Sequence, residues 1–146
     1  MKQEITACAF IHKKFDGVEK VFLAKRAKTK KFLPDVYELL GGHIERGESS
    51  IDGLKREIKE ELGMKIEIGD SFFTFSYDGR DSQTTETIYF AQFAEPIENI
   101  KLNSEDHSES NWFAENEIGK IISENKRGND PEIQAIRKGF ELLKEN

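Results

Sequence analysis

Three glutamates near the middle of the chain are spaced so that a helix would place them on one surface. Glu57, Glu60 and Glu61 fall inside segment 49–62, and helical side chains three or four positions apart are neighbours. Such carboxylates repel one another, so their crowding needs a reason. Together they offer hard oxygen ligands that suit Mg²⁺, Mn²⁺ or Ca²⁺ rather than zinc. The spacing therefore indicates either a divalent metal site or a solvated, charged helix face.

The helix that carries these glutamates has well-marked ends. Ser49 is a suitable N-cap with Asp52 three positions later, and Gly63 stands where a left-handed residue would end the helix. An apolar stripe is expected to pack on a sheet and consists of Ile51, Leu54, Ile58 and Leu62. Gly53 shares the glutamate side, and a helical glycine costs about 1 kcal/mol relative to alanine. We expect it to let another group approach the helix closely.

The remaining pattern alternates between strands and helices. We expect strands over 5–11, 18–24, 36–40, 65–68, 71–77, 84–93 and 111–113, and helices over 49–62, 115–124 and 131–144. Asp16-Gly17 predicts a tight turn between the first two strands. Interleaved strands and helices with hairpins among them predict the α/β class, with a mixed sheet flanked by helices.

Length and composition limit the classes of function. At 146 residues, the whole span 1–146 fits one domain with its own core. The net charge of −6 argues against non-specific binding to nucleic acid or to an anionic membrane. A single cysteine, Cys8, excludes an intramolecular disulfide and is expected to be a buried, inert thiol.

No segment approaches the roughly 18 apolar residues of a membrane span, and the start "MKQEITACAF" lacks the pattern of a secretory signal. A cytoplasmic location is therefore expected. A homodimer is allowed but not specified by the sequence.

The frame in which the carboxylates sit resembles a known signature. From Gly42 the chain reads Gly, five residues, Glu48, seven residues and then "REIKEELGM", ending at Met64. This is similar to the Nudix box, G-x5-E-x7-R-E-U-x-E-E-x-G-U, at every fixed position, and the wider chain looks like a MutT-like member of that family. Leu40 stands where members commonly carry proline, and this difference removes no metal ligand.

The resemblance implies a Nudix-type α/β/α sandwich that binds Mg²⁺, with Mn²⁺ as the alternative, together with a diphosphate-linked substrate. It implies metal ligation by the Gly41 carbonyl and by Glu57, Glu60 and Glu61. It also implies that Glu48 pairs with Arg56 to hold the loop against the helix. The expected catalytic residues are Glu57, Glu60 and Arg56.

The expected chemistry is metal-assisted hydrolysis, in which the cation neutralises phosphate charge and lowers the pKa of a bound water. Glu57 is the first choice for the general base. The rivals come from the loop "NSEDHSES" and are Glu105, Asp106 and Glu109. Glu109 stands three residues before Trp112, much as a loop glutamate does in MutT-like proteins.

Substrate contacts are harder to place. Lys25 and Arg26 begin the basic segment "KRAKTKK" and could approach phosphates, although a solvated loop is the alternative. Asn129, before the last helix, resembles a purine contact of MutT-like proteins but also fits a plain turn. Most aromatic residues of the expected hairpin should be core, and one or two could stack on a base: Phe73, Phe75, Tyr77, Tyr89 and Phe90.

Three functions stay open at this point. The first is a pyrophosphohydrolase of (deoxy)nucleoside triphosphates or modified nucleotides, which the small size favours. The resemblance points the same way, because ADP-ribose pyrophosphatases of the family tend to have a proline downstream of the box and Met64 to Glu95 contains none. The second is a Nudix hydrolase of another diphosphate, such as ADP-ribose, a nucleotide sugar or a dinucleoside polyphosphate. The third is a nucleotide-sensing Nudix module without turnover, against which the intact carboxylates argue.

Overall fold

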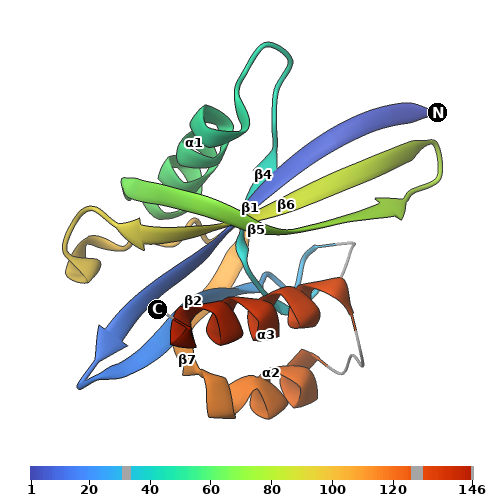
Figure 1. Cartoon of the computed structure of the whole chain (residues 1–146). Coiled ribbons are helices and arrows are strands. Elements are labelled where there is room, and N and C mark those ends of the chain that lie inside the picture. Colours follow the sequence, from blue (N-terminus) through green and yellow to red (C-terminus); the bar gives the residue numbers. More distant parts are fainter. Residues whose placement is uncertain (31–33, 126–129, 146) are drawn as a thin grey trace.

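The chain folds into a mixed sheet with helices on both faces (Figure 1). The computed structural model describes residues 1–30, 34–125 and 130–145. The strands are β1 (Lys2–Phe15), β2 (Val18–Arg26), β3 (Tyr37–Glu38), β4 (Leu40–His43), β5 (Ile66–Asp78), β6 (Ser82–Phe93) and β7 (His107–Ala114). The helices are α1 (Ser50–Leu62), α2 (Ile118–Asn125) and α3 (Pro131–Lys144), with short 3-10 turns η1 (Ile97–Asn99) and η2 (Glu115–Glu117). The predicted α/β class with a mixed sheet is confirmed.

Strand β1 organises the sheet. The strands follow the order β3-β2-β1-β6-β5, with β4 paired to β1 and β7 paired to β2. The pairing of β1 with β6 is parallel, whereas the other pairings are antiparallel. Asp16 and Gly17 join β1 to β2 with positive φ angles of 50° and 81°, as a tight hairpin turn requires.

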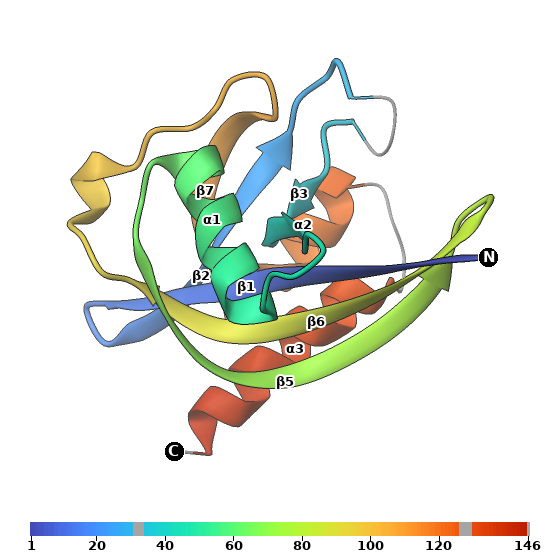
Figure 2. The same cartoon turned by 90° about the horizontal axis from the view of Figure 1, so that it is seen from above.

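Both faces of β1 are covered, which explains why its middle segment is apolar without interruption. Phe10 packs in one core with α2 and α3, while its neighbours Ala9 and Ile11 pack in a second core with α1. A strand buried on both faces reads as a continuous apolar run rather than an alternating one. Figure 2 shows α1 over β1 on one side and α3 along β5 and β6 on the other.

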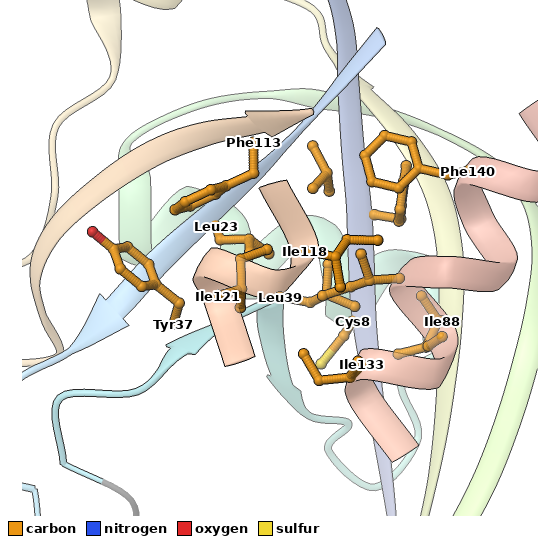
Figure 3. Close-up of a cluster of buried hydrophobic side chains, with 14 residues drawn as sticks. Cys8, Leu23, Tyr37, Leu39, Ile88, Phe113, Ile118, Ile121, Ile133 and Phe140 are labelled. Carbon is orange, nitrogen blue, oxygen red and sulfur yellow. The ribbon is translucent and has the colours of Figure 1, made fainter. Parts of the chain in front are cut away.

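The core beneath α2 and α3 is closed by side chains from distant parts of the chain (Figure 3). Phe140 of α3 meets Phe10 edge-on, with ring centroids 5.3 Å apart. Tyr37 of β3 packs in the same way on Phe113 of β7, at 5.0 Å. This core fixes the start of α3 against the sheet.

Several predicted boundaries are wrong in an informative way. The expected strand 36–40 is interrupted at Leu39, and the glycine pair 41–42 lies inside β4 rather than after a strand. The predicted strands 65–68 and 71–77 are parts of one strand, β5, which begins at Ile66 and whose pairing with β6 is irregular around Ser71. Shifts of register at this point let the strand continue, so the two predicted strands are one.

The helices match their predictions more closely. α3 begins at Pro131 as expected, with Asp130 as its N-cap. The predicted helix 115–124 is instead the turn η2 followed by α2. In α1, Ile51 does not join the buried stripe, because 36% of the residue is exposed in the first turn. No helix in the described ranges has the length and apolar character needed to cross a bilayer.

Candidate active site

Helix α1 is held at both ends and along one side. The hydroxyl of Ser49 accepts a hydrogen bond from the Asp52 backbone N–H at 3.1 Å, and Gly63 ends the helix at φ 67°. Leu54, Ile58 and Leu62 are fully buried against the sheet. These contacts fix the rotation of α1 about its axis. The polar side of α1 therefore faces β4 and the loop between β4 and α1.

Arg56 connects the loop to the helix. Its Nε and Nη2 donate to the two carboxylate oxygens of Glu48 at 2.8 and 3.0 Å, and Nη2 also donates to the carbonyl of His43 at 3.1 Å. This two-pronged pairing lowers the pKa of Glu48 to about 2. The structure thus brings together the two residues that the resemblance paired.

Two glycines allow the loop and strand to approach the helix. A Cβ at Gly53 would lie 2.7 Å from Glu48 Oε1 and 2.6 Å from Ile44 Cδ1. A Cβ at Gly42 would lie 2.5–2.8 Å from the Glu57 carboxyl group. Gly53 therefore admits Glu48, as its position in the helix predicted, and Gly42 brings β4 against Glu57.

The three glutamates of α1 occupy different environments. Glu60 has an exposed side chain that meets Arg56 Nη1 at 3.3 Å. Glu57 also meets Arg56 Nη1, at 3.2 Å, with only 18% of its side chain exposed. Burial raises the pKa of Glu57, and Arg56 opposes part of that rise.

Glu61 is the least compensated of the three carboxyl groups. Its Oε2 atom is buried and has no hydrogen-bond partner among the described residues. Burial, followed by the negative charges of Glu57, Glu38 and Asp106, raises the pKa of Glu61 to about 9. No set of three acidic, histidine or cysteine side chains in the described ranges already stands in the arrangement of a formed metal cage.

The loop before β7 is tied to the end of α1. The backbone N–H groups of Lys101 and Asn103 donate to the carbonyls of Leu62 and Glu61, at 2.9 and 3.0 Å. Asp106 follows in this loop, and its charge contributes to the raised pKa of Glu61. Of the three loop carboxylates considered from sequence, Asp106 is the one whose charge acts on the α1 cluster.

Glu109 and Glu105 are placed differently, and Glu109 lies in strand β7, which begins at His107, rather than in the predicted loop. Glu109 accepts a hydrogen bond from the Tyr37 hydroxyl at 2.6 Å and lies 3.7 Å from Lys25 Nζ. These contacts, the Tyr37 bond first, lower the pKa of Glu109. Glu105 is exposed, and its backbone N–H donates to Asn103 Oδ1. Neither residue is among the charges that raise the pKa of Glu61.

The predicted substrate residues are only partly brought to the site. Arg26 lines a cavity beside Gly42 and donates to Glu38 at 3.4 Å. Lys25 is engaged with Glu109 instead. Asn129 lies outside the described residues.

That cavity, of about 480 Å³, contains functional candidates that sequence reasoning missed. It is lined by Thr6, Cys8, Arg26, Glu38, Leu39, Gly42, His43, Phe75, Tyr77, Glu86, Pro131 and Glu132. Three of these residues, Glu38, Glu86 and Glu132, are carboxylic acids from β3, β6 and α3. One signal was readable: the alternation of β6 places Glu86 on the same face as buried Thr84 and Ile88.

The family comparison agrees with this architecture. The model of the NUDIX domain matches residues 3–137. The chain therefore belongs to the NUDIX domain family.

Individual relatives are more distant. A nucleoside triphosphatase NudI of Escherichia fergusonii is 39% identical over 66 residues, which cover 45% of this chain and 44% of that protein. An 8-oxo-dGTP diphosphatase of Buchnera aphidicola is 40% identical over 47 residues, covering 32% of this chain and 35% of that protein. The chain thus matches less than half the length of these curated relatives. The structure of a C. elegans Ap4A hydrolase superposes with a TM-score of 0.78 at 19% identity, covering 98% of this chain and 99% of that one, which is a likeness of fold.

Proposed function

We propose that this protein is a metal-dependent pyrophosphohydrolase of nucleoside triphosphates or modified nucleotides, releasing a monophosphate and pyrophosphate. The observation that carries the proposal is the environment of Glu61. Its buried, unpartnered oxygen stands in a negative field to which Glu57 and Glu60 of the same helix contribute. Such a field is costly unless a positive ligand joins it.

A divalent cation fits these residues. Carboxylate oxygens are the ligands that Mg²⁺ and Mn²⁺ prefer, and Glu57, Glu60 and Glu61 with the carbonyl of Gly41 would hold the ion. When bound, the ion supplies charge neutralisation at the phosphates and a water of lowered pKa. The likeness to proteins named nucleoside triphosphatase and 8-oxo-dGTP diphosphatase supports the choice of substrate class.

The chain's own residues supply positioning and proton transfer. Arg56 holds Glu57 and Glu60 in place while it clamps Glu48 and the carbonyl of His43. Glu57 is the proposed general base, because its carboxyl group lies beside those of Glu60 and Glu61, is largely withdrawn from solvent and is held by Arg56. Of the three rivals we retain Asp106, because its charge contributes to the raised pKa of Glu61, while its carboxylate also pairs with Lys30 Nζ at 2.7 Å. Arg26, beside Gly42, is the proposed phosphate contact.

The test is a panel of nucleotides assayed with Mg²⁺ or Mn²⁺. It should contain nucleoside triphosphates, 8-oxo-dGTP, ADP-ribose, a nucleotide sugar and a dinucleoside polyphosphate. We expect turnover of a triphosphate that stops when EDTA is added. Preferential hydrolysis of another diphosphate would replace the proposed substrate class by that diphosphate. Tight binding without any hydrolysis would favour a nucleotide-sensing module.

Variants of the ligand set accompany this panel. Glu60→Gln and Glu61→Gln should each lower kcat by about 100-fold or more, because each removes a charged metal ligand. Glu67→Gln, at an exposed position of β5, is the matched control and should retain activity. Circular dichroism must show that all three variants are folded. Full activity in Glu60→Gln and Glu61→Gln would contradict the proposed site.

Other expectations stay predictions. They are the organisation of 1–146 as one domain, the cytoplasmic location, the homodimer and the absence of binding to nucleic acid and membranes.

A further inference from the structure

The cavity beside Gly42 is separate from the α1 glutamates but adjoins them. Gly42 lines the cavity and also lies against the Glu57 carboxyl group. Its volume of about 480 Å³ lies within the range of small-molecule sites. A nucleotide whose phosphates meet Glu57 and its neighbours could therefore place its other end here.

Glu86 is a buried acid that pairs with no cation among the described residues. It is 8% exposed and projects from β6 into the cavity wall. The Cys8 thiol is its hydrogen-bond partner, and no lysine, arginine or histidine of the described ranges forms an ion pair with it. A thiol is a weak donor, so most of the hydrogen-bonding capacity of Glu86 remains for a ligand. Burial raises the pKa of Glu86 to about 7.

Glu132 approaches the cavity from the first turn of α3. One of its oxygens accepts a hydrogen bond from the Leu39 backbone N–H, and no side-chain cation in the described part of the chain pairs with it. Burial, followed by the charges of Glu38 and Glu86, raises the pKa of Glu132. Glu38, in contrast, is satisfied by Arg26 at 3.4 Å and by His107 at 2.9 Å. Two acids of the cavity therefore remain available to a ligand.

The remaining walls define what that ligand must be. Next to Glu86 and Glu132 a phosphate is disfavoured, because neither acid pairs with a cation of the described residues. Arg26, the proposed phosphate contact, lines the same cavity but pairs with Glu38. Phe75 and Tyr77 follow each other along one face of β5, with ring centroids 6.1 Å apart. Aromatic walls suit a flat ring, which can stack on them. The cavity thus combines a surface for a planar group with hydrogen-bonding groups that favour N–H donors.

We propose that this cavity binds the base of the nucleotide and that Glu86 and Glu132 select bases with an exocyclic amino group beside a ring nitrogen. A carboxylate accepts hydrogen bonds from such an amino group and from a neighbouring ring N–H, whereas a neutral carboxyl group accepts from the amino group and donates to an unprotonated ring nitrogen. The amino group is the donor in both cases. This inference rests on the proposed function, because it assumes that the α1 side holds the phosphates.

Binding to non-hydrolysable nucleotides tests the inference apart from turnover. Calorimetry with Mg²⁺ would compare the α,β-methylene triphosphates of guanosine and inosine, and of adenosine and purine riboside, because each pair differs by one amino group. We expect the amino compound to bind about 10-fold more tightly in at least one pair. Equal affinities within both pairs, or no binding of any of the four, would overturn the inference.

Two variants identify the residues responsible. Glu86→Gln and Glu132→Gln keep the side-chain shape but lose one acceptor, so the preference should fall to about 3-fold or less in at least one of them. Glu67→Gln, with the same change at an exposed position of β5, should keep the full preference. Retention of the preference in both cavity variants, each verified as folded by circular dichroism, would refute the assignment.

Hydrolysis of the parent triphosphates, measured in parallel, separates the two levels of proposal. Turnover without any amino-group preference would leave the proposed function standing and remove this inference. A preference in binding without turnover of any nucleotide would support this inference and contradict the proposed function.

Discussion

Glu61 and Glu60 show how far adjacent residues of one charged helix can differ. From composition, the segment "KREIKEE" fits a solvated surface helix. That interpretation holds for Glu60, whose side chain is 58% exposed. It is wrong for Glu61, whose Oε2 atom is withdrawn from water without a partner. A single turn of helix therefore carries both a solvated acid and one whose oxygen is buried without a hydrogen-bond partner among the described residues.

The raised pKa of Glu61 predicts a pH-dependent stability of the metal-free protein. The folded state keeps this proton up to about pH 9, whereas the unfolded chain loses it near 4.5. The folded state binds more protons between these values, so its stability falls as pH rises through that window. In EDTA, the unfolding midpoint should fall from pH 5 to pH 9, and Glu61→Gln should reduce that slope.

Comparison with Glu61→Gln is needed because Glu86 and Glu132 also have raised pKa values and act in the same direction. Mg²⁺ should raise the midpoint of the wild type at pH 8 more than that of Glu61→Gln, because the cation binds the ionised form. If the unfolding midpoint in EDTA depended on pH with the same slope in the wild type and in Glu61→Gln, Glu61 would not titrate as described.

At the scale of elements, α1 depends on a glycine that lowers its intrinsic helix stability. Gly53→Ala should gain up to about 1 kcal/mol from helix propensity. The new Cβ, however, would meet Glu48 Oε1 at 2.7 Å, and that carboxylate is already held by Arg56. We expect little gain in urea unfolding and a clear loss of kcat.

Gly119→Ala is the matched control for this change. Gly119 lies in α2, where an added Cβ would meet nothing within 4 Å. It should therefore be stabilising, with unchanged activity. A Gly53→Ala protein that is both more stable and fully active would show that the contact with Glu48 is unimportant.

Substitutions at the two glycines of β4 should affect different properties, stability at Gly41 and activity at Gly42. A Cβ at Gly41 would fall 2.0 Å from the backbone oxygen of Ala7, whereas one at Gly42 would meet the side chain of Glu57. Gly41→Ala should destabilise the fold by about 1–3 kcal/mol, because a backbone atom cannot move aside cheaply. Gly42→Ala should lower turnover more than stability. Thermal unfolding and kcat, measured on both variants, check this contrast.

At the scale of the whole molecule, the site depends on how α3 docks on the sheet. Gly139 of α3 lies against the Phe10 ring, and a Cβ there would approach Phe10 Cε2 to 2.6 Å. That ring is surrounded by Phe72, Phe90 and Phe140 in edge-on contacts. The position of α3, and with it that of Glu132 in its first turn, follows from this packing.

Gly139→Ala should therefore destabilise the protein despite its better helix propensity. Overpacking of a filled core costs about 1–3 kcal/mol, against a gain of about 1 kcal/mol from propensity. Urea unfolding would show a lower midpoint than in the wild type, opposite in sign to the same exchange at Gly119. An unchanged or raised midpoint would mean that α3 can shift without cost.

The sequence by itself determined the elements whose signals are local. The caps of α1, the start of α3 at Pro131 and the turn at Asp16-Gly17 follow from capping and turn chemistry. The pairing of Arg56 with Glu48 was predicted from a resemblance confined to 23 consecutive residues. Such features depend on residues a few positions apart, so no knowledge of the fold was needed.

Tertiary structure decided which distant residues share a site. Glu38, Glu86 and Glu132 line one cavity because β6 pairs with β1 in parallel and α3 docks across the sheet. Asp106 rather than Glu109 acts on α1 because two backbone hydrogen bonds tie the loop 101–103 to the helix end. Strand register and helix docking are set by the whole core at once, and no local pattern of residue types encodes them.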